Sequence, residues 1–369
     1  MFQINENILN GILIFSILQA FLFGLLFLTK KNKSLPDILI GLWLFLLAIQ
    51  TFLIFYSHNN LSIGFLTRLP IIITLLYGPM QFLYVSKICY GNVKIKILEL
   101  LHFIPFLIFS ILAIPFQTSG IFIKTLAGIS SIAGLSYCFF TLRLLMKHKV
   151  NIRNYFSFTE KVNLAWLYKL VVGLLIIWFG VVVLVFLRRI FNINLSLDWF
   201  FAAIPVFIFY LGYHGIKQQV IYSFDINSRE TDNSPESLEN PVTAKEAYKK
   251  SGLRPVQMQS INEKMLNLMQ SENLFLHSTL SLQELSDKLN IPTYHITQTL
   301  SEFCKQNFYD FVNSYRINEF KKRIDNGDAK NFSLLGIAFD CGFNSKSSFN
   351  RIFKNITGIT PSAYRIMHS

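Results

Sequence analysis

The chain has 369 residues, of which 52% are hydrophobic and only 15% are charged, and its formal net charge is +13. This composition is too apolar for an ordinary soluble protein. Residues 1–215 hold 16 Lys and Arg against 5 Asp and Glu, so most of the positive charge belongs to the apolar part and indicates membrane loops. The four cysteines lack metal-ligand spacing, and we expect no disulfide, metal or cofactor.

Seven apolar segments follow one another in the first 215 residues. They are Ile8–Leu28, Ile38–Tyr56, Leu69–Val85, Leu100–Phe116, Ile121–Leu142, Leu167–Leu187 and Trp199–Tyr213. Most approach the roughly 20 residues that a helix needs to cross a bilayer core, although the third, fourth and seventh are shorter. We therefore predict a seven-helix transmembrane bundle over residues 1–215.

The cations that flank these segments predict the orientation of the bundle. With the N-terminus outside the cell, eleven Lys and Arg lie in cytoplasmic loops and four lie outside. Cytoplasmic loops of membrane proteins carry such an excess. We expect a multi-pass protein of the cell (inner) membrane, with its N-terminus outside and, after seven crossings, its C-terminal region in the cytoplasm.

Three charged residues near the outer ends of the last two segments form a candidate signal site. They are Arg188, Arg189 and Asp198. Ionisable residues inside membrane segments are costly to bury, which makes them candidates for function. Arginines at the end of a segment can also extend to the interface, and a plain ion pair with Asp198 is the simpler interpretation.

Residues 216–254 change abruptly to Ser, Asn, Glu, Asp and Pro. Such a stretch cannot bury a core. We therefore predict a polar cytoplasmic linker here, followed by a third region over residues 255–369 in which apolar residues recur with helical spacing.

This third region contains two similar helix-turn-helix patterns, at about residues 280–303 and 333–356. Ser281 and Ser333 are expected N-caps, Ser281 opening a capping box with Glu284, and Gly342 supplies the backbone freedom of a tight turn. The first helices of the two patterns align with an offset of 52 residues. After a turn longer by one residue, the second helices align with an offset of 53, which matches Gln298 to Arg351, as an internal repeat does. We expect their second helices to bury Ile296, Leu300, Phe303, Phe349, Ile352, Phe353 and Ile356.

A helix predicted over Tyr309–Ile324 separates the two patterns. At 1.5 Å per residue it is about 24 Å long. Successive major grooves on one face of DNA lie about 34 Å apart. A rod of this length can therefore place both second helices, as recognition helices, on one duplex.

Several short motifs carry a family resemblance. Asn313-Ser-Tyr-Arg316, Ile337-Ala338, Gly342-Phe343, Phe353-Lys354 and Gly358-x-Thr-Pro-x-x-Tyr-Arg365 together resemble the DNA-binding domain of the AraC family of bacterial transcriptional regulators. Tyr77-Gly-Pro79, His102-Phe-Ile-Pro105 and Tyr248-Lys-Lys-Ser-Gly-Leu253 resemble the membrane-embedded branch of that family. The resemblance implies an all-α chain: a seven-helix transmembrane bundle, then a cytoplasmic AraC-type domain with two helix-turn-helix subdomains joined by a linker helix.

The resemblance also implies which residues contact DNA. Base contacts are expected at Tyr294, Thr297, Gln298, Lys346, Ser347, Asn350 and Arg351. Lys305 and Lys354 are expected at phosphates, with plain solvated surface as the alternative, and Arg316, Phe343 and Pro361 are assigned to the architecture. Arg can pair with guanine and Asn or Gln with adenine in the major groove.

These features together predict a membrane-integral, one-component transcription regulator that binds promoter DNA and responds to a signal at its transmembrane region. A membrane enzyme or transporter with a DNA-binding tail is the alternative, but the five acidic residues before residue 215 form no catalytic-looking pair, so we expect no enzyme. In a further alternative the spans are a passive anchor. Expected partners are double-stranded promoter DNA and the lipid bilayer; RNA polymerase, an unidentified signal ligand or membrane partner, and a second copy in a homodimer are further candidates.

Overall fold

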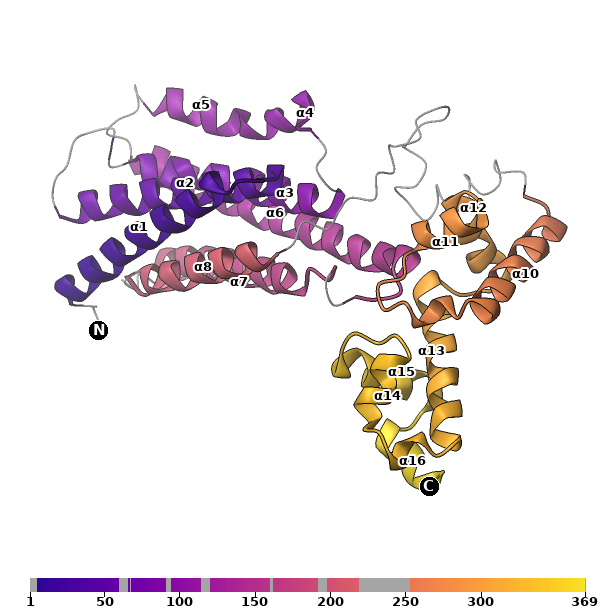
Figure 1. Cartoon of the computed structure of the whole chain (residues 1–369). Coiled ribbons are helices and arrows are strands. Elements are labelled where there is room, and N and C mark those ends of the chain that lie inside the picture. The colour runs from indigo at the N-terminus through magenta and orange to yellow at the C-terminus, as the bar shows by residue number, and fades with distance from the viewer. Residues whose placement is uncertain are drawn as a thin grey trace. The chain divides into compact units, whose positions relative to one another are not determined.

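The computed structural model describes residues 5–59, 66, 68–90, 94–113, 120–159, 162–191, 198–218 and 253–368. Regular elements within these ranges are helices, apart from one isolated β-bridge between Phe156 and Ser281 (Figure 1). The chain divides into two compact units. The first comprises Met1–Lys147 and Leu164–Ile226, and the second comprises His148–Asn163 and Asn227–Ser369.

The predicted membrane segments fall on helices of the first unit. These are α1 Glu6–Thr29, α2 Leu35–His58, α3 Leu69–Tyr90, α4 Ile97–Leu100, η2 Leu101–Phe103, α5 Ile104–Leu112, α6 Gly120–Tyr155, α7 Ala165–Phe191 and α8 Asp198–Lys217. Helix α6 continues past Lys147, so its last two turns belong to the second unit.

Five helices are long and apolar enough to cross a membrane. They are α1, α2, α3, Lys124–Tyr155 of α6 and Ala165–Leu184 of α7. Two further apolar helices, Ile97–Leu112 and Phe201–Lys217, fall short of the roughly 20 residues that a straight crossing needs. Length and composition thus support five spans in the described ranges, and the count of seven crossings stays a prediction.

Aromatic side chains fill the centre of the first unit. Trp43 of α2 is 1% exposed, and its ring packs edge-on against Tyr84 of α3 and Phe207 of α8, with ring centroids 6.4 and 5.9 Å apart. Helix α1 packs on α2 and α8, and α2 packs on α3 (Figure 1). The apolar faces of these helices therefore bury one another inside the unit.

Small residues of α6 face the same interior. A Cβ atom on Gly134 would lie 2.4 Å from Cε2 of Trp178 in α7, which leaves no room for a side chain. Ser130 and Ser131 are buried, and both hydroxyls donate to the carbonyl of Ala127, at 3.0 and 2.8 Å. Small residues of this kind let two membrane helices approach closely. Here they serve packing within one copy of the chain.

The second unit consists of shorter helices. They are α10 Pro255–Ser271, η4 Leu274–Leu276, α11 Leu282–Leu289, α12 Thr293–Gln298, η5 Thr299–Phe303, α13 Phe308–Asp325, η6 Asp328–Lys330, α14 Leu334–Asp340, α15 Lys346–Thr357 and α16 Pro361–Met367. The two predicted helix-turn-helix patterns fall on α11 with α12 and on α14 with α15. The predicted joining helix is α13.

Helix α13 contributes to both buried clusters of this unit. Its Phe311 and Val312 lie in a cluster with residues of α10, α11 and α12. Its Ile317 and Phe320 lie in a second cluster with residues of α14, α15 and α16. One helix thus forms part of the core under each helix-turn-helix pattern.

Two residues expected in these cores are exposed instead. Phe303 is 45% exposed because η5 is a π-turn, in which the amide of Cys304 donates to the carbonyl of Thr299 at 3.0 Å. The wider turn rotates the residues that follow it relative to an α-helix. Ile356 lies in the last turn of α15 and is 49% exposed. Helical spacing predicts which face of a helix a residue lies on. It does not predict whether neighbouring helices cover that face along its whole length.

Candidate nucleic-acid interface

Helix α15 separates a buried face from a polar face. Ser345 caps its N-terminus by accepting the amide of Ser348 at 3.2 Å. Phe349, Ile352 and Phe353 are buried against the second cluster. The opposite face consists of exposed residues: Lys346, Ser347, Asn350, Arg351 and Lys354. Amide, guanidinium and ammonium groups along one exposed helix face suit the edges of bases and the phosphates of DNA.

The turn before α15 requires glycine. Gly342 has φ +92°, and a Cβ atom there would lie 2.6 Å from the carbonyl oxygen of Phe275 and 2.9 Å from Nε of Arg316. An L side chain at this position would therefore be strained twice, by its backbone conformation and by close contact. The close approach packs the turn of the second pattern against η4 and α13.

Arg351 is the one base-contact candidate on α15 that a core residue holds in place in the structure. Its Nη2 donates to the hydroxyl of Tyr309 at 2.9 Å, and Tyr309 is 2% exposed on α13. Ser347 lies with its hydroxyl 3.2 Å from that of Ser345. The guanidinium of Arg351 is thus held at the junction of α13 and α15 by one of its five N–H donors.

Helix α12, the second helix of the first pattern, presents fewer of the expected base-contact groups than α15. Tyr294 is 46% exposed, and its ring centroid lies 4.1 Å from that of His295. Thr297 is half-buried and donates its hydroxyl to the carbonyl of Thr293 at 2.9 Å. Burial lowers the pKa of His295 below its ordinary value of 6.5.

Gln298 does not lie where the repeat places it. Its side chain is 2% exposed, and its Nε2 donates to Oε2 of Glu302 at 3.1 Å. Alignment of the two patterns matched Gln298 to the exposed Arg351, but α12 passes into the π-turn η5 right after Gln298, whereas α15 continues as an α-helix. The two second helices therefore do not present equivalent positions equally.

The two phosphate-contact candidates are both exposed. Lys305 follows η5 with φ +55°, a left-handed conformation, and Lys354 lies on the polar face of α15. An exposed ammonium group on a long flexible chain suits a phosphate, which carries charge but no sequence information.

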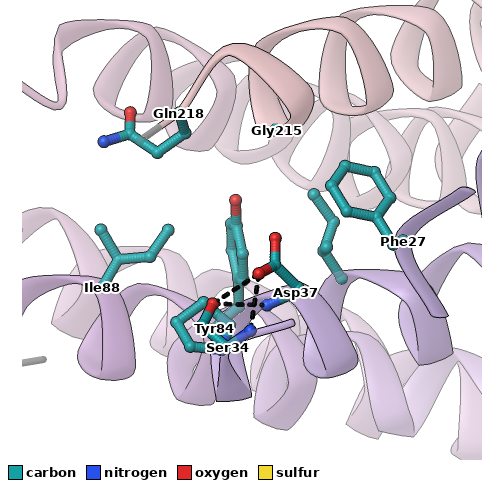
Figure 2. A pocket seen from close by; sticks show the side chains of 9 residues that line it. Phe27, Ser34, Asp37, Tyr84, Ile88, Gly215 and Gln218 are labelled. Atoms are coloured by element: carbon teal, nitrogen blue, oxygen red, sulfur yellow. Dashed lines mark hydrogen bonds between the residues drawn. The ribbon is translucent and has the colours of Figure 1, made fainter. Parts of the chain in front are cut away.

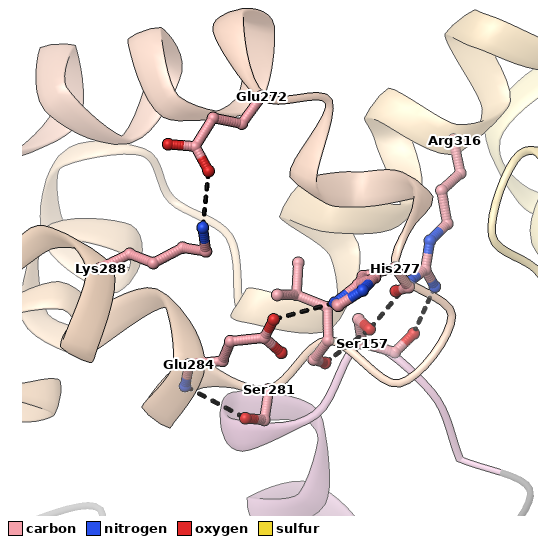
Figure 3. Close-up of polar contacts among 8 residues, drawn as sticks. Ser157, Glu272, His277, Ser281, Glu284, Lys288 and Arg316 are labelled. Atoms are coloured by element: carbon pink, nitrogen blue, oxygen red, sulfur yellow. Dashed lines mark hydrogen bonds and ion pairs between the residues drawn. The ribbon is translucent and has the colours of Figure 1, made fainter.

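The capping box predicted at Ser281 forms only in its first half. The hydroxyl of Ser281 accepts the amide of Glu284 at 3.2 Å, whereas the Glu284 carboxylate lies 2.9 Å from Nδ1 of His277 (Figure 3). Beside it, Lys288 pairs with Glu272 at 2.6 Å. Glu284 thus contacts His277 at the end of η4 and does not accept a hydrogen bond from the backbone of its own N-cap residue.

Arg316 has the architectural role expected of it. The residue is 1% exposed, and its Nε donates to the carbonyl of Phe275 at 2.7 Å. Its Nη2 donates to the carbonyl of His277 at 2.7 Å (Figure 3). It also donates to Ser157, at 3.1 Å to the carbonyl and 3.1 Å to the hydroxyl. Spacing along the chain offered no signal for this last contact, because the two residues are 159 positions apart.

The candidate signal site lies outside the described side chains. Nothing in the structure bears on the side chains of Arg188, Arg189 and Asp198. In the first unit a small pocket surrounds Asp37, which sequence analysis did not single out (Figure 2). Its carboxylate accepts the amide and the hydroxyl of Ser34, each at 2.7 Å, and pairs with Lys30 at 2.9 Å.

The Asp37 pocket suits a structural role better than ligand binding. Its volume is about 10 Å³, about the lower limit for a single water molecule. Ser34 and Asp37 form a complete capping box, and an acidic group in the first turn complements the helix dipole. The polar contacts at the pocket therefore stabilise the turn between α1 and α2.

Two motifs of the membrane resemblance meet inside the first unit. Nδ1 of His102 lies 2.8 Å from the hydroxyl of Tyr137, and the rings of Phe82 and Tyr137 have centroids 6.3 Å apart. Gly78, from the other motif, faces the same tyrosine, since a Cβ atom there would lie 2.3 Å from Cδ2 of Tyr137. Tyr137 of α6 thus joins the two motifs in one polar–aromatic cluster.

Residues 285–367 match the family model of a helix-turn-helix domain. The chain is 35% identical over 92 residues to an uncharacterized HTH-type transcriptional regulator of Staphylococcus aureus strain COL. The matched stretch is 25% of this chain and 12% of that relative. Over 86 residues, 23% of the chain, it is 27% identical to the probable transcription factor PqrA of Proteus vulgaris, covering 68% of that protein. The chain thus spans about 12% of the length of the Staphylococcus relatives it matches. No solved structure shows a significant match.

Proposed function

We propose that this chain, whose C-terminal domain is an AraC-type helix-turn-helix domain, is a membrane-integral transcription regulator that binds promoter DNA sequence-specifically and responds to a signal at its membrane region. The observation that carries the proposal is the polar face of α15, where five exposed residues lie opposite a buried aromatic face. Any amphipathic surface helix has a polar face, and what favours DNA recognition here is that this face lies within residues 285–367, which match a helix-turn-helix domain.

In this proposal some residues of α15 contact bases and others contact phosphates. Arg351 and Asn350 form bidentate hydrogen bonds with guanine and adenine, respectively, and Lys346 and Ser347 contact neighbouring base edges. Lys354 and Lys305 hold phosphates and so fix the position of the domain on the duplex. Tyr294 and Thr297 supply the weaker contacts of α12, and we leave Gln298 out because its amide is buried.

Membrane integration is supported by five helices that are long and apolar enough to cross a bilayer. Counted for the seven predicted crossings, the flanking cations also lie in excess on one side. On that count we assign the DNA-binding domain to the cytoplasm, where promoters are. The signal acts on the bundle, and the charged residues at the outer ends of α7 and α8 remain a candidate site for it.

Chromatin immunoprecipitation with sequencing tests the regulator function. The tagged full chain should enrich discrete promoter regions that share one sequence motif, and the double variant Asn350→Ala, Arg351→Ala should lose that enrichment at equal protein level. Lys322→Ala is a matched control, since it removes an exposed cation of α13 outside the proposed interface. Enrichment that is uniform along the genome, or equal in wild type and double variant, would reject the proposal.

A further inference from the structure

The cytoplasmic end of α6 and the residues after it dock on the DNA-binding domain. We name residues 153–159 the docking segment. Ser157 at its centre is 1% exposed. Its amide and its hydroxyl both donate to the carbonyl of Leu280, at 3.1 and 2.7 Å (Figure 3), and its neighbour Phe156 forms a β-bridge with Ser281. The segment therefore adds a short piece of extended backbone to the start of α11.

The DNA-binding domain supplies donors for this segment. The carbonyl of Ser157 accepts from Nη1 of Arg316 and from Nδ2 of Asn313, both at 3.1 Å. Its hydroxyl also accepts from Nη2 of Arg316 at 3.1 Å. Asn313 and Arg316 are each 1% exposed. Buried donors need partners, so the docking segment completes hydrogen bonding inside the domain.

Docking brings two side chains next to proposed DNA contacts. The guanidinium of Arg153 lies 5.2 Å from the ring centroid of Tyr309, the same tyrosine whose hydroxyl accepts from Arg351. Asn154 lines an open depression together with Thr297 and Lys305. Arg153 thus contacts the tyrosine that also holds Arg351, and Asn154 shares a depression with Thr297 of α12.

The charge of this region favours DNA as the partner. Residues 148–163, the stretch of the second unit that contains the docking segment, hold three cations, Lys149, Arg153 and Lys161, against one carboxylate, Glu160. The one carboxylate that lines the depression, Asp310, accepts from Nδ2 of Asn307 at 2.7 Å. A segment that competed with DNA for this surface is expected to carry negative charge. A basic segment instead attracts the phosphate backbone.

We propose that the docking segment is a third part of the DNA interface, in which Arg153 contacts a backbone phosphate between the two recognition helices and Ser157 holds it there. This inference rests on the proposed function. Cations at the end of a span also serve membrane orientation, but orientation needs no buried serine and no contact with Tyr309.

The full chain in nanodiscs of neutral phosphatidylcholine tests this assignment. The probe is a duplex that the full chain itself selects from a random-sequence library, and the dissociation constant is measured against salt concentration. Arg153→Ala should raise the dissociation constant about fivefold or more on the selected and on a scrambled duplex, and should reduce the salt slope by about 0.9, as the loss of one phosphate contact does. Arg153→Lys keeps the charge and should keep the slope.

Arg143→Ala is the matched control. It removes an exposed cation of the same helix, ten residues earlier and so about 15 Å along the axis, and should leave affinity and salt slope unchanged. Ser157→Ala, which keeps Arg153, should weaken binding in the same direction as Arg153→Ala. Equal affinity of wild type and Arg153→Ala, or tighter binding by the variant, would overturn the inference.

A disulfide that fixes the docking segment in place distinguishes two roles: a segment that contacts DNA, and a segment that blocks the DNA-binding surface. Phe156→Cys with Ser281→Cys places thiols on paired residues of an antiparallel bridge, whose Cα spacing suits a disulfide. Under our inference the oxidised protein binds the selected duplex as well as its reduced form. If binding is lost on oxidation and restored by dithiothreitol, the docked segment blocks the DNA-binding surface and the inference is overturned. If the wild-type chain selects no sequence at all, the proposed function fails instead.

Discussion

At the scale of single residues, Arg351 and Arg153 both contact Tyr309 but have different expected roles. Arg351 belongs to the polar face of α15, beside Asn350. Arg351→Ala and Asn350→Ala should each cost about 1–3 kcal/mol on the selected duplex and almost nothing on a scrambled one, because bidentate base contacts carry sequence information. Dissociation constants on the two duplexes measure this difference.

Lys354→Ala provides the contrast for that measurement. A phosphate contact should weaken binding to both duplexes alike, with a reduced salt slope. If Arg351→Ala behaves in the same way as Lys354→Ala, then Arg351 is a phosphate contact and its assignment to a base is wrong.

Phe349 tests the core beneath the polar face. Its side chain is 2% exposed, and its ring centroid lies 4.7 Å from that of Phe320 and 5.2 Å from that of Phe343. Phe349→Ala should destabilise the second helix-turn-helix by about 3–5 kcal/mol. Faster amide hydrogen exchange across α14 and α15 would report it. Phe339→Ala, at a 45% exposed site of α14, is the control, and equal exchange in the two variants would contradict the assignment.

At the scale of elements, α14 depends on its N-cap. It has only seven residues, and the hydroxyl of Ser333 accepts the amide of Gly336 at 3.0 Å. Ser333→Ala should lower the stability of this helix by about 1 kcal/mol, whereas Ser333→Asp keeps an acceptor and should keep the stability. Amide exchange of α14 measures both variants. No difference between Ala and Asp would mean that the cap contributes little.

At the scale of the whole molecule, the excess of cations on one side predicts the topology. Reporter fusions after Lys33, Tyr90 and Lys149 should lie in the cytoplasm, and fusions after Asn59 and Gly120 should lie outside, because positive loops stay in the cytoplasm. Paired reporters, one active on each side of the membrane, measure this pattern. The reverse pattern would put the DNA-binding domain outside the cell and reject the proposed function.

The predicted linker over residues 216–254 lies mostly outside the described residues, and its behaviour stays a prediction. A flexible polar chain does not transmit direction. A Gly-Ser insertion of about ten residues between Asn233 and Ser234 should therefore leave promoter occupancy unchanged, as measured by chromatin immunoprecipitation at equal protein level. Occupancy that falls would indicate a rigid linker.

The sequence by itself determined the features that depend on neighbouring residues. Capping serines at 281 and 333 start their helices, Gly342 has the positive φ that its turn needs, and the repeated spacing located both helix-turn-helix patterns. Runs of apolar residues located the five helices that are long and apolar enough to cross a membrane. Backbone preferences and helical periodicity act over a few residues, so a linear pattern records them.

Only the tertiary structure decided which faces are covered and by what. In the structure Gln298 is buried beside a π-turn that the spacing of apolar residues does not predict, and Phe303 is exposed. The tertiary structure also brought Ser157 from the end of α6 to Arg316, on the helix between the two patterns. Contacts between residues this far apart depend on how helices pack against one another, and packing depends on the shapes of many side chains at once rather than on any local spacing.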